Sequence, residues 1–266
     1  AGATWSVPTI VNMRKDHEQS LLVGPGRGMV TSKGRILFTA YEFTGSDKNS
    51  VAIYSDDGGK TWERGKSVSG WSSEAVVTEA DGKLYMFTRH GGYYTSDDFG
   101  ETWSTQKNMG ISYWLNCQLT AITYPKKIDG KTAILFATPS SSSGRAAGKI
   151  FVGLVQDDGT LDWKYNYSIN GSAYYAYSCL TILPDGTIGL LYESDGTVIT
   201  YEDFDIEDVA KGAAIGNIWC TDENGTVADV TMTSDMSKKL TVNGLKDGAK
   251  AVSYTHLRAH ETGRNL

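Results

Sequence analysis

Apolar residues in this chain come in short runs of strand-forming side chains, separated by polar turns that contain glycine. Runs such as "RILFTAYEF", "KLYMFTR" and "TIGLLYE" alternate with turns such as "ADGK", "IDGK" and "PDGT". An Asp-Gly pair between apolar runs is a strong signal for a β-hairpin. A helical spacing of apolar residues is clear only in "FDIEDVAKG", residues 204–212. The pattern therefore predicts an all-β chain built mostly of antiparallel sheets.

Two nearly identical octets stand out, "SDDGGKTW" at residues 55–62 and "SDDFGETW" at residues 96–103. Both fit Ser-x-Asp-x-Gly-x-Thr-Trp, with Ser55, Asp57, Gly59, Thr61 and Trp62 in the first and Ser96, Asp98, Gly100, Thr102 and Trp103 in the second. The Asp can accept backbone N–H bonds across a tight turn, the Gly can take a positive φ, and the Trp can pack into the sheet. A turn that is repeated once per unit cannot lie at a single active centre, so the octets indicate architecture.

The octets resemble the Asp box, also called the bacterial neuraminidase repeat, which is typical of β-propellers. Their spacing of about forty residues suits one propeller blade. The resemblance implies an incomplete β-propeller of the six-bladed sialidase type, with about three to four antiparallel four-stranded blades present. We expect the blades within residues 28–68, 72–108, 115–169 and 177–203, the third of them holding a weaker octet, "QDDGTLDW". Residues 1–212 would form this propeller without its first blades. Residues 213–252 would begin a β-sandwich-like module or form a linker, and residues 253–266 would be a non-native tail.

Candidate chemistry lies outside the octets. Glu74 begins one strand-like run and Arg89 ends the next, Arg145 lies in a loop of small residues, Tyr177 precedes an apolar run, and Glu193 ends another. Taken singly, each has an ordinary explanation. Charged residues at hairpin ends are usually solvated, and a Tyr at the start of a strand is usually half-buried.

The order of these residues, together with "GPGRGMVTSKGRILFTAYEF" and "YSCLTILPDGTIGLLYE", resembles the bacterial exo-sialidases and related trans-sialidases. The resemblance implies a retaining glycoside hydrolase that releases terminal sialic acid from glycoconjugates. Tyr177 would be the nucleophile and Glu74 its base, while Arg89 and Arg145 would be two of three arginines that bind the substrate carboxylate. Glu193 would orient the remaining arginine.

The chemistry of the substrate explains these residue types. Sialic acid carries a carboxylate on its anomeric carbon, which planar guanidinium groups bind in a bidentate fashion. A carboxylate nucleophile would be repelled by that charge, whereas a neutral phenol is not, and a neighbouring Glu can take its proton. Sialidases are a known exception among glycosidases in using a Tyr nucleophile.

The chain also departs from the family pattern. The family's first arginine lies in an Arg-Ile-Pro segment, followed by an acid/base Asp, and no such segment occurs in this sequence. We therefore expect negligible turnover by the chain alone. The alternatives are a non-catalytic carbohydrate-binding Asp-box propeller, a trans-sialidase, and a glycosidase for neutral polysaccharides, which would use a carboxylate pair instead of converging arginines.

Composition and charge limit the classes of partner that this chain could bind. The net charge of −6 argues against a nucleic-acid partner, and no apolar run is long enough to span a membrane. The three cysteines and four histidines show no metal-ligand spacing, so we expect neither a metal nor another cofactor. The expected partners are sialylated glycans or glycoproteins, and the expected location is secreted or at the cell surface.

Overall fold

The computed structural model describes residues 3–216, 218–221, 227–234, 240–243 and 250–253. Strands dominate this part of the chain, and every strand pairing in it is antiparallel. The short helix α1 (Ile206–Val209) lies in the segment where the sequence predicts helical spacing. None of the helices in the described residues has the length and apolar composition needed to cross a membrane. The prediction of an all-β antiparallel fold is confirmed.

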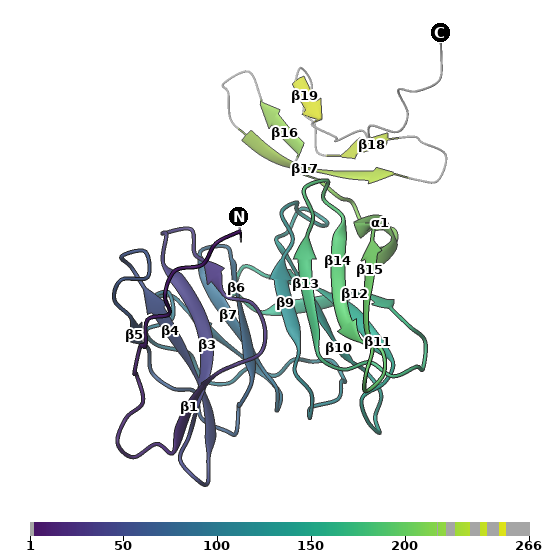
Figure 1. Ribbon diagram of the computed structural model, residues 1–266. Helices are drawn as coiled ribbons and strands as arrows, with labels where there is room; N and C mark the ends of the chain where they lie inside the picture. The colour runs from purple at the N-terminus through teal and green to yellow at the C-terminus, as the bar shows by residue number, and fades with distance from the viewer. Residues whose placement is uncertain (1–2, 217, 222–226, 235–239, 244–249, 254–266) are drawn as a thin grey trace.

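Four sheets follow one another in chain order (Figure 1). The first contains β1 (Ser20–Val23), β2 (Met29–Val30), β3 (Ile36–Phe43), β4 (Lys48–Ser55) and β5 (Glu63–Arg64). The second contains β6 (Ala75–Ala80), β7 (Lys83–Thr88) and β8 (Tyr93–Ser96). The third contains β9 (Thr120–Thr123), β10 (Ala133–Pro139), β11 (Gly148–Val155) and β12 (Leu161–Ser168), and the fourth contains β13 (Ser178–Ile182), β14 (Ile188–Glu193) and β15 (Ile199–Phe204).

These sheets fall in the four stretches expected for blades, with two differences. The first sheet starts earlier than expected, because β1 pairs with β3. The sheets have three to five strands instead of a uniform four, although an isolated bridge between Tyr93 and Lys107 extends the second sheet. The number of strands varies because an outer strand pairs with only one neighbour, so whether it forms depends on the local turns.

Three apolar cores lie between successive sheets, as in a stack of blades. Leu37 and Ala52 of the first sheet pack with Leu84 of the second. Phe87 of the second packs with Phe136 of the third, and the remaining core joins the third sheet to the fourth and to α1. The central strand β10 is buried at every position, whereas the outer strand β12 alternates between half-buried and exposed residues. Burial on both faces therefore marks the inner part of the stack.

Beyond residue 216, the described residues form a further sheet with strand order β18-β17-β16-β19. Its strands are β16 (Ile218–Thr221), β17 (Val227–Ser234), β18 (Leu240–Asn243) and β19 (Lys250–Ser253). The assignment of residues 213–252 to a β-sandwich-like module or linker stays a prediction. The expected tail lies outside the described residues, apart from Ser253 at the end of β19.

Candidate functional site

Glu74 and Arg89 are brought together by the β6–β7 hairpin. Ala75 pairs with Thr88 in its register, so the residue before β6 lies opposite the residue after β7. The Arg89 N–H donates to the Glu74 carbonyl at 2.9 Å, which continues the ladder by one step. Their side chains also meet, because Arg89 Nη1 lies 2.8 Å from Glu74 Oε2. The two ends of the hairpin thus form a partly buried ion pair.

Tyr177, which directly precedes β13 in the fourth sheet, completes this cluster. Its hydroxyl donates to the Glu74 carboxylate, at 2.7 Å from Oε1 and 3.0 Å from Oε2. Arg89 Nη1 in turn donates to the Tyr177 oxygen at 3.1 Å. Glu74 is only 9% exposed, so these contacts form with little competition from water.

The surroundings of Tyr177 raise its pKa to about 12. Burial is the largest cause, and the hydrogen bond and negative charge of Glu74 act in the same direction. The positive charges of Arg89 and Arg145 oppose this shift by favouring the phenolate. Tyr177 is therefore a neutral phenol at neutral pH, with a base at its hydroxyl and two cations that can stabilise its deprotonated form.

Arg145 reaches the same cluster from the loop before β11. Residues Arg145 and Ala146 pair with the segment that leads to Tyr177, through a Tyr175 N–H bond to the Arg145 carbonyl and a bridge between Ala146 and Tyr174. The Arg145 guanidinium carbon lies 5.2 Å from the centre of the Tyr177 ring. Burial is the largest single influence on Arg145 and opposes its charge, but its hydrogen bond to Tyr174 and the charges of Cys117, Tyr177 and Tyr174 together outweigh burial, so the pKa of Arg145 is above its usual value.

Glu193 lies next to this cluster through its backbone. Its N–H donates to the Tyr177 carbonyl at 3.0 Å, and its carbonyl accepts from the Ala176 N–H at 3.1 Å. The Glu193 charge also reaches the buried thiol of Cys117, which lies within range of Glu74, Arg89 and Arg145. The structure thus brings together all five residues selected from the sequence. The orienting role of Glu193 stays a prediction.

Sequence reasoning missed three neighbours of this cluster. Asn116 Oδ1 accepts a hydrogen bond from Arg89 Nη2 at 2.7 Å. Burial raises the pKa of the Tyr41 phenol, and the nearby negative charge of Glu74 raises it further. Burial is also the main cause that raises the pKa of the Cys117 thiol to about 11. Tyr41 lies in the stretch "GPGRGMVTSKGRILFTAYEF" but is not singled out there, and Asn116 and Cys117 belong to no motif. Each lies near the site only because separate sheets stack side by side.

The Asp boxes lie apart from this cluster. Leu84 at the start of β7 pairs with Ser96, so the second box is at the opposite end of its sheet from Glu74 and Arg89. Within each box the Asp carboxylate binds its own turn. Asp57 accepts from the Lys60 and Thr61 N–H groups at 2.9 Å, and Asp98 accepts from the Thr102 N–H at 2.9 Å. Both carboxylates are thus occupied by structural hydrogen bonds.

The glycines and tryptophans of the boxes have similar structural roles. Gly59 and Gly100 have φ values of 89° and 95°, a region that favours glycine. The Trp62 ring centre lies 5.8 Å from that of Phe38, and Trp103 packs against the core between the first two sheets. The boxes therefore close strands and cover cores.

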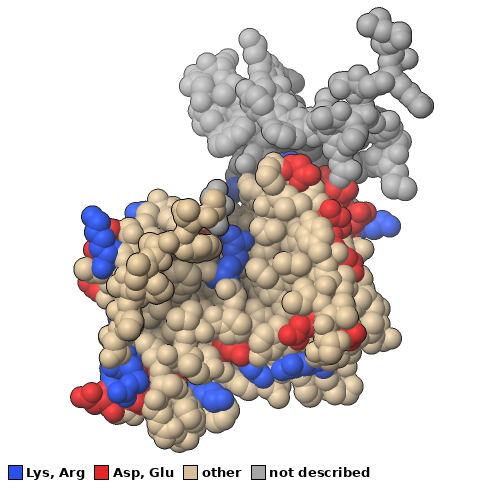
Figure 2. Space-filling view, in the orientation of Figure 1, with Lys and Arg blue, Asp and Glu red and all other residues tan. Residues whose placement is uncertain are grey.

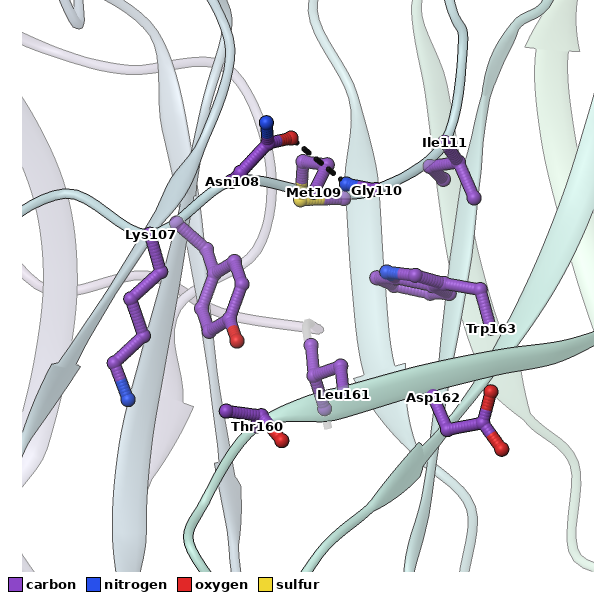
Figure 3. A pocket seen from close by; sticks show the side chains of 10 residues that line it. Lys107, Asn108, Met109, Gly110, Ile111, Thr160, Leu161, Asp162 and Trp163 are labelled. Carbon is purple, nitrogen blue, oxygen red and sulfur yellow. Dashed lines mark hydrogen bonds between the residues drawn. The ribbon is translucent and has the colours of Figure 1, made fainter.

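The surface is hollowed between the sheets drawn on the left and on the right of Figure 1, and a patch of Lys or Arg atoms lies on the wall of this hollow in Figure 2. A separate cavity of about 540 Å³ is lined by residues of the second and third sheets, including Lys107, Asp162 and Trp163 (Figure 3). None of the five site residues lines that cavity. Among the described residues, no group of three or more His, Cys, Asp or Glu side chains is placed to hold a metal ion.

Several known proteins similar to this chain are named sialidases. A model of the BNR repeat-like domain family matches residues 2–200. Anhydrosialidase of Macrobdella decora is 36% identical over 81% of this chain and 32% of its own length. Sialidase B of Streptococcus pneumoniae is 37% identical over 70% of this chain and 30% of its own length. The chain thus spans about a third of the length of these relatives.

Solved structures agree with these matches. The intramolecular trans-sialidase from Ruminococcus gnavus, in complex with oseltamivir carboxylate, superposes with a TM-score of 0.71 at 33% identity, over 79% of this chain and 49% of that one. The leech intramolecular trans-sialidase complexed with 2,7-anhydro-Neu5Ac gives a TM-score of 0.70 at 33% identity, over 79% of this chain and 35% of that one. The chain therefore belongs to the BNR repeat-like domain family and, within it, to the sialidases.

Proposed function

We propose that this chain carries part of the active site of a retaining exo-α-sialidase that releases terminal sialic acid from glycoproteins and other sialylated glycans. The observation that carries the proposal is the hydrogen bond of 2.7 Å from the Tyr177 hydroxyl to Glu74, with Arg89 and Arg145 beside the same phenol. A pure binding propeller has no use for a phenol paired with a base. A glycosidase for neutral sugars has no use for cations that converge on it.

The geometry supports a mechanism in two steps. The guanidinium groups of Arg89 and Arg145 bind the substrate carboxylate and place the anomeric carbon next to the Tyr177 oxygen. As that oxygen bonds to the carbon, the phenolic proton passes to Glu74, and the glycosidic oxygen leaves as an alcohol that takes its proton from an acid that this chain does not supply. Water or another hydroxyl then attacks the glycosyl-tyrosine and gives its proton to the conjugate base of that acid, while the proton on Glu74 returns to the departing phenolate.

Calorimetric titration with 2,3-didehydro-2-deoxy-N-acetylneuraminic acid tests the sugar and the cations together. This unsaturated analogue has a flattened ring like that of the transition state. We expect the chain to bind it, and Arg89→Ala to weaken binding by roughly 10- to 100-fold, because a charge-assisted contact is lost. Circular dichroism of both proteins checks that they are folded.

The methyl ester of the same analogue is the matched ligand control, because it keeps the ring and loses the charge. We expect the unsubstituted chain to bind the ester much more weakly than the acid. Equal affinity for acid and ester, or equal affinity of the chain and Arg89→Ala for the acid, would contradict a carboxylate-binding role for these arginines.

We also propose that the chain alone turns over sialosides negligibly, because its sequence has no Arg-Ile-Pro segment and no matching acid/base Asp. A sialoside with a poor leaving group needs that acid, whereas a sialyl fluoride does not. We therefore expect release from the fluoride and not from sialyllactose. Robust release from sialyllactose would contradict this part of the proposal. A secreted or cell-surface location is also proposed, since sialylated glycans are found outside cells.

Intramolecular transfer is the second candidate, because two of the relatives are named anhydrosialidase and intramolecular trans-sialidase. In that reaction a hydroxyl of the sugar itself attacks the glycosyl-tyrosine. The product then lacks one water relative to sialic acid. Mass spectrometry of the product from sialyl fluoride distinguishes the two reactions.

A further inference from the structure

Three sheets meet at the site, and the middle one supplies Arg145 from its β10–β11 loop but neither the proposed base nor the proposed nucleophile. Glu74 and Arg89 flank the hairpin of the second sheet, and Tyr177 leads into the fourth. Strand β9 of the third sheet lies between them, in contact with both β6 and β13. The distance between base and nucleophile therefore depends on how β9 and the residues before it hold the two neighbouring sheets.

Gln118 holds the start of β13. It is 2% exposed, and its amide makes two hydrogen bonds to the residue that follows Tyr177. Its Oε1 accepts from the Ser178 N–H at 2.8 Å, and its Nε2 donates to the Ser178 carbonyl at 3.0 Å. Two residues further along, Thr120 Oγ1 accepts from the Leu180 N–H at 3.1 Å. Side chains thus replace the missing backbone ladder between β9 and β13, which belong to different sheets.

Asn116 holds the other partner. Its Oδ1 accepts from Arg89 Nη2 at 2.7 Å, and its backbone carbonyl accepts from the same nitrogen at 3.3 Å. The opposite nitrogen, Nη1, is then directed at Glu74 and Tyr177. A guanidinium that is fixed at both ends cannot rotate about its axis, so its cationic edge stays beside the phenol.

We propose that Asn116 and Gln118 are positioning residues that together set the contact between the Tyr177 phenol, Glu74 and Arg89. The catalytic meaning of this contact rests on the proposed function, but the contact itself can be measured without any sugar. Catalytic geometry is sensitive to such control, since a misplacement of about 1 Å can cost about 100-fold in rate.

Nitration of tyrosine by tetranitromethane measures the contact, because the reagent attacks the phenolate. Peptide mapping by mass spectrometry compares Tyr177 with Tyr201, which is 52% exposed and serves as an internal reference. Tyr85, at 0% exposure, reports unfolding if it reacts. We expect Gln118→Ala to raise the Tyr177 to Tyr201 ratio at least fivefold, because the phenol leaves the buried contact with Glu74 that keeps it protonated.

Gln118→Met keeps the side-chain volume and removes the hydrogen bonds, so it is expected to match Gln118→Ala. Thr78→Val is the matched control. The Thr78 hydroxyl accepts from the Thr123 N–H at 3.0 Å and so also joins the second sheet to β9, but further along β6 from Glu74. We expect this variant to keep the wild-type ratio. A wild-type ratio in both Gln118 variants, or an equal rise in Thr78→Val, would overturn the role of Gln118.

Asn116→Ala should shift the ratio in the opposite direction. Arg89 favours the phenolate, so a released guanidinium leaves Tyr177 more protonated, and we expect nitration to fall at least twofold. Asn116→Ser keeps a neutral side-chain oxygen as acceptor and should retain more of the wild-type ratio than Asn116→Ala. General loosening of the site would raise nitration in every variant. A rise in Asn116→Ala would therefore overturn the role of Asn116, and Asn116, being exposed, can be changed even if Gln118 variants fail to fold.

Calorimetry with the unsaturated analogue separates this proposal from the proposed function. If the Gln118 and Asn116 variants shift nitration in opposite directions but the wild-type chain does not bind the analogue, the result would support the positioning role and count against the sialidase site. Binding of the analogue by the wild-type chain, with nitration ratios unchanged in all variants, would support the sialidase site and overturn positioning.

Discussion

The Tyr177 phenol shows how its neighbours set the protonation state of a single residue at this site. Burial and Glu74 together raise the pKa of its phenol to about 12, although Arg89 and Arg145 oppose the shift. A phenol with this pKa does not lose its proton to water at neutral pH. It can lose it to the carboxylate that already accepts its hydrogen bond, at the moment when the oxygen bonds to carbon. In the proposed mechanism, base and nucleophile therefore act as a pair.

Trapping with a 3-fluorosialyl fluoride tests this pair, because the fluoride leaving group needs no acid and the second fluorine slows release of the adduct. We expect a covalent adduct on Tyr177 in the unsubstituted chain, located by peptide mapping, and none in Tyr177→Phe. Glu74→Gln should label roughly 100-fold more slowly or worse, because the proton has no acceptor. An adduct on a different residue would contradict the assignment of the nucleophile.

Arg64 illustrates a purely structural use of charge. Its guanidinium contacts Glu18 at 2.9 Å and Glu42 at 2.6 Å, and the Glu18 side chain is fully buried. Arg64 also donates to the Met13 carbonyl, so it ties the N-terminal segment to the first sheet. Arg64→Met should lower the free energy of unfolding by about 3–5 kcal/mol, because two carboxylates lose their shared cation.

Urea unfolding measures this loss, and Arg14→Met provides the control. Arg14 is exposed and makes its hydrogen bonds to nearby backbone carbonyls, so its replacement should change stability far less. Similar losses in the two variants would show that the buried ion cluster has no special role.

At the scale of elements, the Asp box acts as a cap that closes the end of a strand. Asp98 accepts from the Thr102 N–H at 2.9 Å and from the Ser96 hydroxyl at 2.7 Å, and the Gly100 N–H donates to that same hydroxyl. Asp98→Ala should lower the free energy of unfolding by roughly 1–3 kcal/mol, since several donors of the turn lose their acceptor. Binding of the unsaturated analogue by the folded variant should not change, because the box lies at the far end of its sheet. A selective loss of binding would contradict the structural role.

The pattern of elements was predictable from the sequence wherever the signal is local. Asp-Gly turns and repeated boxes depend on a few consecutive residues, so they revealed the hairpins, including the β6–β7 hairpin that pairs Glu74 with Arg89. The strand β12 lies within the expected third blade, although the sequence analysis treats its Trp163 as the end of a weaker octet. Asn116 and Gln118 could not be found, since their partners lie far along the chain and in other sheets. The resemblance to a family supplied what local patterns could not.

At the scale of the whole molecule, stability and function share the same stack of sheets. The contact between Glu74 and Tyr177 joins the second sheet to the fourth, and the cores on either side of the third sheet hold that distance. Several of the phenols in this stack are buried. Burial raises the pKa of Tyr124 to about 12, and burial together with a hydrogen bond to Glu202 raises that of Tyr192 to about 12.

Raised phenol pKa values make the fold sensitive to alkali. An unfolded tyrosine titrates near pH 10, and the folded state holds the proton of Tyr124, Tyr177 and Tyr192 until about pH 12. Their contribution to stability is complete below pH 10 and is lost as the pH rises from 10 to 12. In that window each such group should lower the free energy of unfolding by up to about 1.4 kcal/mol per pH unit. Urea unfolding at intervals between pH 8 and 11.5 measures the slope.

Single substitutions isolate one phenol from this sum. Tyr192→Phe removes a buried hydroxyl, so the loss of stability with pH should become shallower by about the contribution of one group. Tyr201→Phe is the matched control, because Tyr201 lies on β15, as does Glu202, but is 52% exposed. If the two variants kept the same slope as the unsubstituted chain, the buried phenols would not be the cause of alkaline unfolding. A shallower slope in Tyr192→Phe alone would mean that alkali destabilises this stack in part by deprotonating Tyr192, which its packed sheets keep neutral at lower pH.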